Sequence, residues 1–135
     1  MTLQLTLAND PNAIAESQYG VAQKVQFTPI TSCILLAYRT SENLILGIHL
    51  VMVGPDDEPF SAADVPTVQA VLSQYSVDPS SGLVFGQTQL WNENLPAAYQ
   101  ALIGGIGDPR IEDLDDGTYG AEFIDDTIES YAAGG

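Results

Sequence analysis

The chain has 135 residues, of which 45% are hydrophobic, and 18 acidic against three basic side chains give a net charge of −15. This charge argues against binding to nucleic acid or to anionic membranes, which requires clustered lysine and arginine, and it favours a protein partner with a basic surface. No apolar run reaches the roughly 18 residues of a membrane span. A lone cysteine cannot form an internal disulfide, and a free thiol suits a reducing compartment, so we expect a cytoplasmic protein.

The first part of the chain carries strand patterns. Polar and apolar residues alternate over 1–7 and again over 21–27, and each alternation predicts a strand. The first of these contains no basic residue, which argues against a secretion signal. Residues 13–22 fit no single pattern. Residues 28–32 contain a proline, which has no amide hydrogen for a ladder, so we expect a connection there.

Two almost wholly apolar runs follow, over 33–38 and 44–53, and a polar turn joins them. Such runs predict strands that are buried on both faces. In a hairpin, a point early in the first strand lies opposite a point late in the second. Pairing therefore brings together Cys33 and His49, each the only residue of its type in the chain.

The remaining residues alternate between helix and strand patterns. Ser61 is expected to cap a helix in which apolar residues recur at helical spacing as far as Tyr75. A second helix is predicted over 94–103 and ends at the glycines that follow. Short strands are predicted over three ranges, 83–88, 111–114 and 119–125.

This order of elements predicts a single mixed α/β (α+β) domain. We expect a layered sandwich of mostly antiparallel strands with two helices packed on one face. The domain is expected to span residues 1–131, and residues 132–135 to form a flexible tail.

Four segments of the chain also carry a resemblance to a known family. They are Thr-Ser-Cys with the apolar strand over 31–37, the glycine-bearing strand with the histidine over 46–52, a helix start over 63–68, and a later strand, helix and glycine turn over 84–86 and 112–120. Their order resembles that of the CheD family of chemoreceptor glutamine deamidases. That family belongs to a wider group of cysteine deamidases, which includes the cytotoxic necrotizing factor toxins.

The resemblance implies a protein-glutamine deamidase. In that family a cysteine attacks a glutamine side-chain amide, a histidine is the base, and an upstream threonine completes the triad. By this resemblance Cys33 is the nucleophile, His49 the base and Thr28 the third member, with Thr31 as the alternative to Thr28. Thr28 lies one residue nearer to the cysteine than the family's threonine does. No cofactor is expected, and one cysteine with one histidine falls short of the four ligands of zinc.

The thiol and the imidazole have the same interpretation on chemical grounds. A neighbouring imidazole can take the proton of a thiol, and the thiolate can then attack an amide carbonyl. Structural roles stay open for both residues. A lone cysteine in an apolar run often fills a core, and a histidine in an apolar strand often bonds to backbone. Trp91 fits either a core position or the wall of a groove.

The acidic residues support an alternative function. Nine of the 18 lie from Asp108 onward, which concentrates negative charge near the end of the chain. The alternative is a non-catalytic acidic binding or inhibitor protein that docks on a basic partner, for example as a mimic of nucleic acid. The acidic segments 56–58 and 113–116 lack the spacing of a full calcium loop, so solvated loops are expected there.

Overall fold

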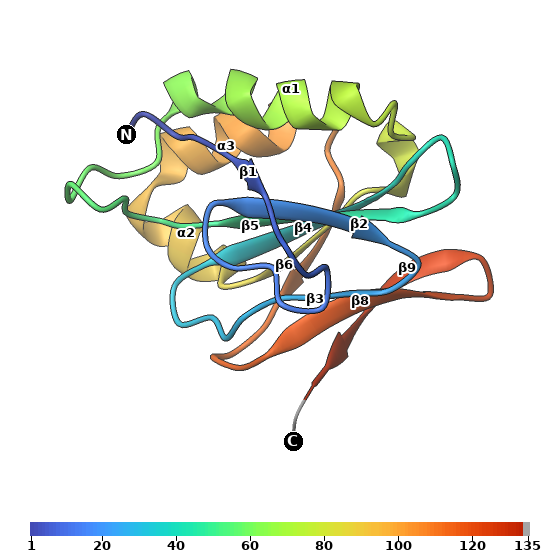
Figure 1. The fold of residues 1–135 in the computed structure, drawn as a ribbon. Coiled ribbons are helices and arrows are strands. Elements are labelled where there is room, and N and C mark those ends of the chain that lie inside the picture. The colour runs from blue at the N-terminus through green and yellow to red at the C-terminus, as the bar shows by residue number, and fades with distance from the viewer. Residues whose placement is uncertain (134–135) are drawn as a thin grey trace.

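The computed structural model describes residues 1–133, which form three layers (Figure 1). A six-stranded sheet is the middle layer, and a three-stranded sheet covers one of its faces. Helices cover the other face, and the described residues contain three of the α type. The predicted mixed α+β sandwich of mostly antiparallel strands is therefore confirmed.

The six-stranded sheet has a central hairpin and two short parallel edges. Its strands, in spatial order, are β1 (Thr6–Leu7), β2 (Gln18–Ala22), β5 (Ile45–Leu50), β4 (Ile34–Arg39), β6 (Leu83–Gly86) and β7 (Arg110–Asp113). The edge strands β1 and β7 run parallel to their neighbours, and the other pairs are antiparallel. Strands β4 and β5 are buried at nearly every position, which confirms the hairpin predicted from their apolar runs.

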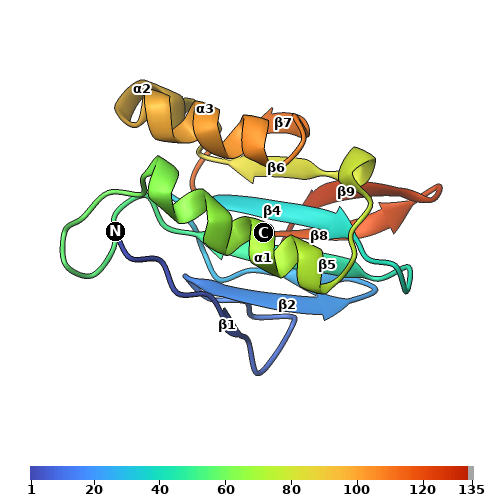
Figure 2. The same cartoon turned by 90° about the horizontal axis from the view of Figure 1, so that it is seen from above.

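The outer layers cover the two faces of this sheet. The three-stranded sheet contains β3 (Val25–Gln26), β8 (Tyr119–Ile124) and β9 (Thr127–Ala132). The helices are α1 (Val65–Gln74), α2 (Thr88–Asn94) and α3 (Pro96–Gly105), with short 3-10 turns at Ala62–Asp64 and Pro79–Ser81. Seen from above, α1 lies over β4 and β5, whereas α2 and α3 lie towards β6 and β7 (Figure 2). No helix within residues 1–133 has both the length and the apolar character that crossing a bilayer requires.

Each face of the six-stranded sheet contributes to its own hydrophobic core. Successive side chains of a strand point to opposite faces, so Leu36 and Tyr38 pack under the helices, whereas Leu35 and Ala37 pack against the three-stranded sheet. Cys33 belongs to this second core, between the two sheets.

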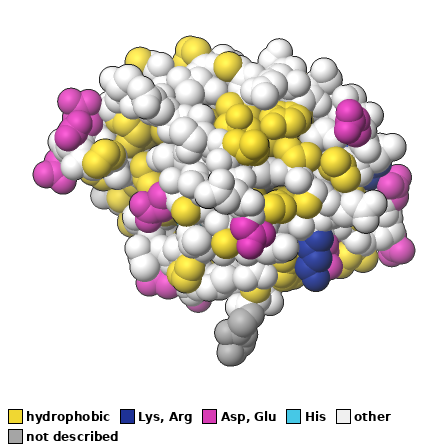
Figure 3. Space-filling model, in the orientation of Figure 1, with side chains coloured by type: hydrophobic (Ala, Val, Ile, Leu, Met, Phe, Trp, Pro, Cys, Tyr) yellow, Lys and Arg dark blue, Asp and Glu magenta, His cyan; other side chains and the backbone are white. Residues whose placement is uncertain are grey.

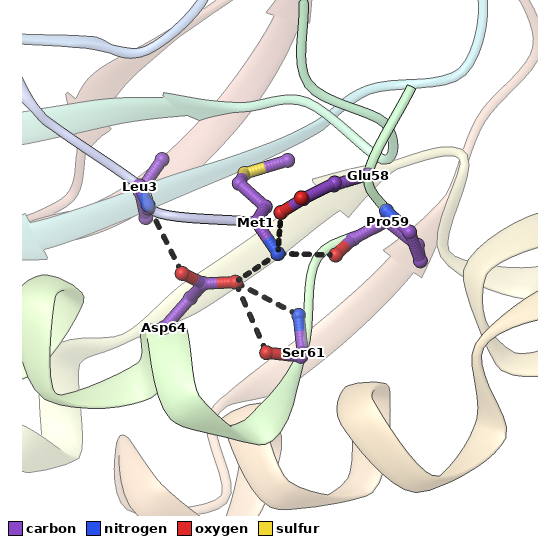
Figure 4. A network of polar contacts seen from close by, with 6 residues as sticks. All are labelled: Met1, Leu3, Glu58, Pro59, Ser61 and Asp64. Carbon is purple, nitrogen blue, oxygen red and sulfur yellow. Dashed lines mark hydrogen bonds and ion pairs between the residues drawn. The ribbon is translucent and has the colours of Figure 1, made fainter. Parts of the chain in front are cut away.

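The beginning of the helical layer is fixed by one buried carboxylate (Figure 4). Asp64 Oδ1 accepts a hydrogen bond from the Leu3 amide at 3.0 Å, and Oδ2 accepts one from the Ser61 amide at 2.9 Å. The amino group of Met1 lies 3.9 Å from the same Oδ2 and 3.2 Å from Glu58. Ser61 stands at the N-cap position, as predicted, and Asp64 ties the first residues of the chain to the helix.

Three predicted elements differ from the observed ones. The single strand over 21–27 is wrong, because the chain bends after Ala22 and enters the other sheet at Val25. The strand over 1–7 shrinks to Thr6–Leu7. The second helix begins earlier than predicted, at Thr88, and its two parts meet at Pro96, which lacks the amide hydrogen that a continuous helix needs.

The end of the chain is also more ordered than expected. Strand β9 had no predicted counterpart, and its residue Ala132 pairs with Tyr119 instead of lying in a flexible tail. The Ala133 amide continues this ladder by donating to the Thr118 carbonyl. The last two residues of the predicted tail, 134–135, lie outside the described residues.

Candidate functional site

The β4–β5 hairpin places Cys33 and His49 on the same face of the six-stranded sheet. Leu35 pairs directly with His49 in the ladder. Residues two apart on a strand share a face, so Cys33 lies on the His49 side, which is the side of the three-stranded sheet. The two residues are diagonal neighbours, whose Cβ atoms are typically about 7 Å apart and within reach of a long side chain.

His49 is fully buried, and only one of its ring nitrogens is paired. Nδ1 lies 2.9 Å from the carbonyl oxygen of Ile14. A carbonyl can only accept, so Nδ1 carries the hydrogen and Nε2 carries a lone pair. Nε2 has no hydrogen-bond partner among residues 1–133. Burial lowers the pKa of His49 below its ordinary value, because the charged ring would be poorly solvated there. The residue is a neutral imidazole with an unpaired acceptor.

The group that orients this ring is a backbone carbonyl and not the hydroxyl of Thr28. The carbonyl of Ile14 also accepts a hydrogen bond from the Thr28 amide, at 3.0 Å. Thr28 therefore acts on His49 through its backbone, by holding the Ile14 oxygen in place. Thr31, the alternative threonine, is exposed. Ile14 gave no sequence signal, because a backbone carbonyl can belong to any residue type.

Cys33 is also nearly sealed, with 3% of its surface exposed. Its thiol points to Glu16, with the sulfur 3.9 Å from Oε1. Burial and, secondly, the negative charge of Glu16 raise the pKa of Cys33 to about 12, although a backbone hydrogen bond from Ser32 opposes this. The resting thiol is therefore protonated at neutral pH. Because Nε2 of His49 is unpaired within the described chain, the thiol and the imidazole do not yet share a proton.

The loop before Cys33 is held by the junction of β6 and α2. The indole of Trp91 donates to the Ser32 carbonyl at 2.7 Å, and the Gln87 amide donates to the Cys33 carbonyl at 3.1 Å. Gly86 permits this approach, because a Cβ on it would lie 2.9 Å from the Cys33 oxygen and its φ is +117°. Trp91 is fully buried, so it is a core residue whose polar edge positions the loop.

Acidic side chains lie beside the site without forming a metal centre. Glu16 is exposed, and Asp116 accepts a hydrogen bond from Gln87 Nε2 at 2.8 Å. Asp113, in the second predicted acidic segment, caps α2 by accepting from the Gln89 amide at 2.8 Å. Across the described residues, no group of three or more His, Cys, Asp or Glu side chains is placed to hold a metal ion.

Comparison of the chain with family models, with curated proteins and with solved structures finds no match. A functional assignment therefore depends on the geometry around the thiol and the imidazole. Besides Ile14, that geometry contains a second residue that the sequence patterns did not reveal, Glu16. It lies in the stretch over 13–22 that fits no pattern, and it meets Cys33 only through the fold.

Proposed function

We propose that the protein is a cysteine-dependent amidohydrolase that deamidates a glutamine side chain of a protein partner. The observation that carries this proposal is Nε2 of His49, which is buried, lacks a partner among residues 1–133 and lies on the same face as the thiol of Cys33. An unpaired buried nitrogen costs about 1–3 kcal/mol of stability. A role as a proton acceptor gives a reason for a fold to retain it.

The proposed reaction begins when the Cys33 thiol turns from Glu16 towards His49. Nε2 takes the thiol proton while the sulfur attacks the amide carbon, and the carbonyl electron pair moves onto the oxygen. The hydrogen bond from Nδ1 to the Ile14 carbonyl stabilises the imidazolium formed in this step. When the oxyanion collapses, the carbon–nitrogen bond breaks, and His49 returns the proton to the departing ammonia.

Water completes the proposed cycle. Nε2 of His49 removes a proton from a water molecule, whose oxygen attacks the thioester carbon. The carbon–sulfur bond then breaks, and the Cys33 sulfur recovers the proton. The products are a glutamate side chain and ammonia, and the balance requires one water and no oxidant or reductant.

Ammonia release from synthetic peptides that each contain one central glutamine tests the proposal. We expect Cys33→Ala and His49→Leu to abolish release, together with the mass increase that marks conversion of an amide to an acid. Thr28→Ala is the matched control, because it keeps the backbone amide that holds the Ile14 carbonyl and should keep most of the activity. Release by Cys33→Ala at the wild-type rate would overturn the proposal.

A second candidate function is an acidic docking protein, and the pairing of the basic side chains favours it. Lys24, Arg39 and Arg110 each form an ion pair with an acidic residue of the β8–β9 hairpin, so they do not neutralise the acids elsewhere. On the face drawn in Figure 3, acidic side chains are scattered from the left edge through the lower middle to the right edge, and basic ones lie only towards the right. Partner affinity that falls steeply with salt supports docking, and a flat dependence contradicts it.

A further inference from the structure

Glu16 combines an exposed position with direct contact to the buried thiol. Its Oε1 lies 3.9 Å from the Cys33 sulfur, and its charge favours the protonated forms of both Cys33 and His49. Glu16 is therefore an exposed residue whose carboxylate lies directly against the buried sulfur. The unpaired, fully buried Nε2 of His49 is the second feature of this site that points to a ligand.

The segment that carries Glu16 is fixed on both sides of it. The Ile14 amide donates to the Gln26 carbonyl at 2.9 Å, and the Ser17 amide donates to the His49 carbonyl at 2.9 Å. Ser17 adopts a φ of 61°, a left-handed conformation that redirects the chain at this point. The backbone that carries Glu16 is therefore held by hydrogen bonds on both sides of this residue.

The chain supplies no cation of its own to this carboxylate. Its three basic side chains form ion pairs with acidic residues of the β8–β9 hairpin. Within residues 1–133 none of them pairs with Glu16. Among the acidic residues, Glu16 is the one whose charge acts on the Cys33 thiol. A cation that neutralises this side of the site must come from the partner.

We propose that Glu16 is a specificity-determining residue that binds a lysine or arginine next to the reacting glutamine of the partner. This inference rests on the proposed function and names its substrate class, a glutamine flanked by positive charge. Pairing with the incoming cation draws the carboxylate away from the sulfur. The thiol is then released to turn towards His49, so the correct substrate itself completes the reactive pair.

The test uses two thiol reagents of opposite charge, because they probe the site without any amide. The 2-(trimethylammonium)ethyl and 2-sulfonatoethyl methanethiosulfonates each transfer an alkylthio group to a thiolate and release methanesulfinate. Cys33 is the only cysteine, so intact mass reports its modification alone. Rates are compared for the wild type, Glu16→Gln and Glu42→Gln. Glu42 is an exposed acid in the turn after β4, at the opposite end of the hairpin from Cys33.

We expect the reaction rate of the cationic reagent, divided by that of the anionic reagent, to fall about tenfold in Glu16→Gln, because a negative charge close to the sulfur is lost. In Glu16→Lys the anionic reagent should react faster than the cationic one. Glu42→Gln removes the same charge from the chain and should leave the ratio unchanged, since salt near 0.15 M screens charges beyond about 8 Å. Equal ratios in Glu16→Gln and Glu42→Gln would overturn the inference. Reaction only through unfolding would also give equal ratios. Failure of glutamine hydrolysis would instead be seen as absent ammonia release in the peptide experiment.

Discussion

Each face of the six-stranded sheet buries a polar side chain, and the two side chains differ in how many of their polar atoms have hydrogen-bond partners. On the helix side, both oxygens of Asp64 accept hydrogen bonds, and the amino terminus lies beside them. On the side of the three-stranded sheet, His49 has one paired and one unpaired nitrogen. Fully satisfied buried groups contribute to a unique fold, whereas a half-satisfied group lowers stability and is retained where function requires it. The comparison separates a structural site from a candidate reactive one.

Of the substitutions considered, the change at Asp64 should lower stability most. Asp64→Asn removes one of two acceptor oxygens and should lower the free energy of unfolding by about 3 kcal/mol, because buried donors lose their partner. His49→Leu should change it by no more than about 1 kcal/mol, because it removes an unpaired nitrogen and leaves the Ile14 carbonyl bonded to Thr28. Midpoints of urea unfolding measure both values. A larger loss in His49→Leu than in Asp64→Asn would reverse the comparison.

A second prediction concerns the backbone that supports the thiol. Gly86→Ala should lower the free energy of unfolding by about 2 kcal/mol, since the added Cβ meets the Cys33 carbonyl and the positive φ disfavours a side chain. Gly104→Ala is the matched control. Apart from its chain neighbours and the backbone of its own helix, no atom of residues 1–133 lies within 4 Å of its added Cβ. This position in α3 should gain about 0.5 kcal/mol of helix propensity.

The same pair of variants distinguishes structural strain at Cys33 from a general effect of adding a methyl group. Gly86→Ala should also change the rate at which the thiol is alkylated, because the carbonyl of Cys33 has to move. Unchanged stability and unchanged alkylation in Gly86→Ala would mean that the β6–α2 junction does not position the thiol.

The sequence was sufficient to predict the parts of the fold that local patterns control. The β4–β5 hairpin followed from two apolar runs and a polar turn, and with it the shared face of Cys33 and His49. Ser61 was predicted as a helix cap, and it caps the 3-10 turn that leads into α1. The switch of sheets between Ala22 and Val25 was missed, although two consecutive polar residues, Gln23 and Lys24, interrupt the alternation there. Which sheet each half joins is decided by packing.

The surroundings of the site were beyond sequence patterns for a different reason. The carbonyl of Ile14 and the carboxylate of Glu16 reach the hairpin from a segment more than 15 residues away, and their roles come from contacts that have no local signature. Trp91 fitted two interpretations equally, because an indole is both large and polar at one edge. Only its burial and its bond to the Ser32 carbonyl separate them.

The stability that His49 contributes should also depend weakly on pH. Burial lowers the pKa of His49 in the folded protein, so below about pH 6.5 the unfolded chain binds a proton that the folded chain does not. The contribution of His49 to stability is therefore complete above that pH. It is lost as the pH falls towards the folded value, with a slope of at most about 1.4 kcal/mol per pH unit.

The measurement is the free energy of unfolding of the wild type minus that of His49→Leu, from about pH 7.5 to about pH 5.5. The acidic residues titrate in both proteins, so the subtraction leaves the histidine alone. We expect this difference in free energy to be constant near pH 7.5 and to decrease as the pH falls below about 6.5. Parallel curves would mean that His49 accepts a proton as readily in the folded chain as in the unfolded one. That result would mean that solvent or the charge of Glu16 stabilises the imidazolium in the folded protein and offsets the effect of burial.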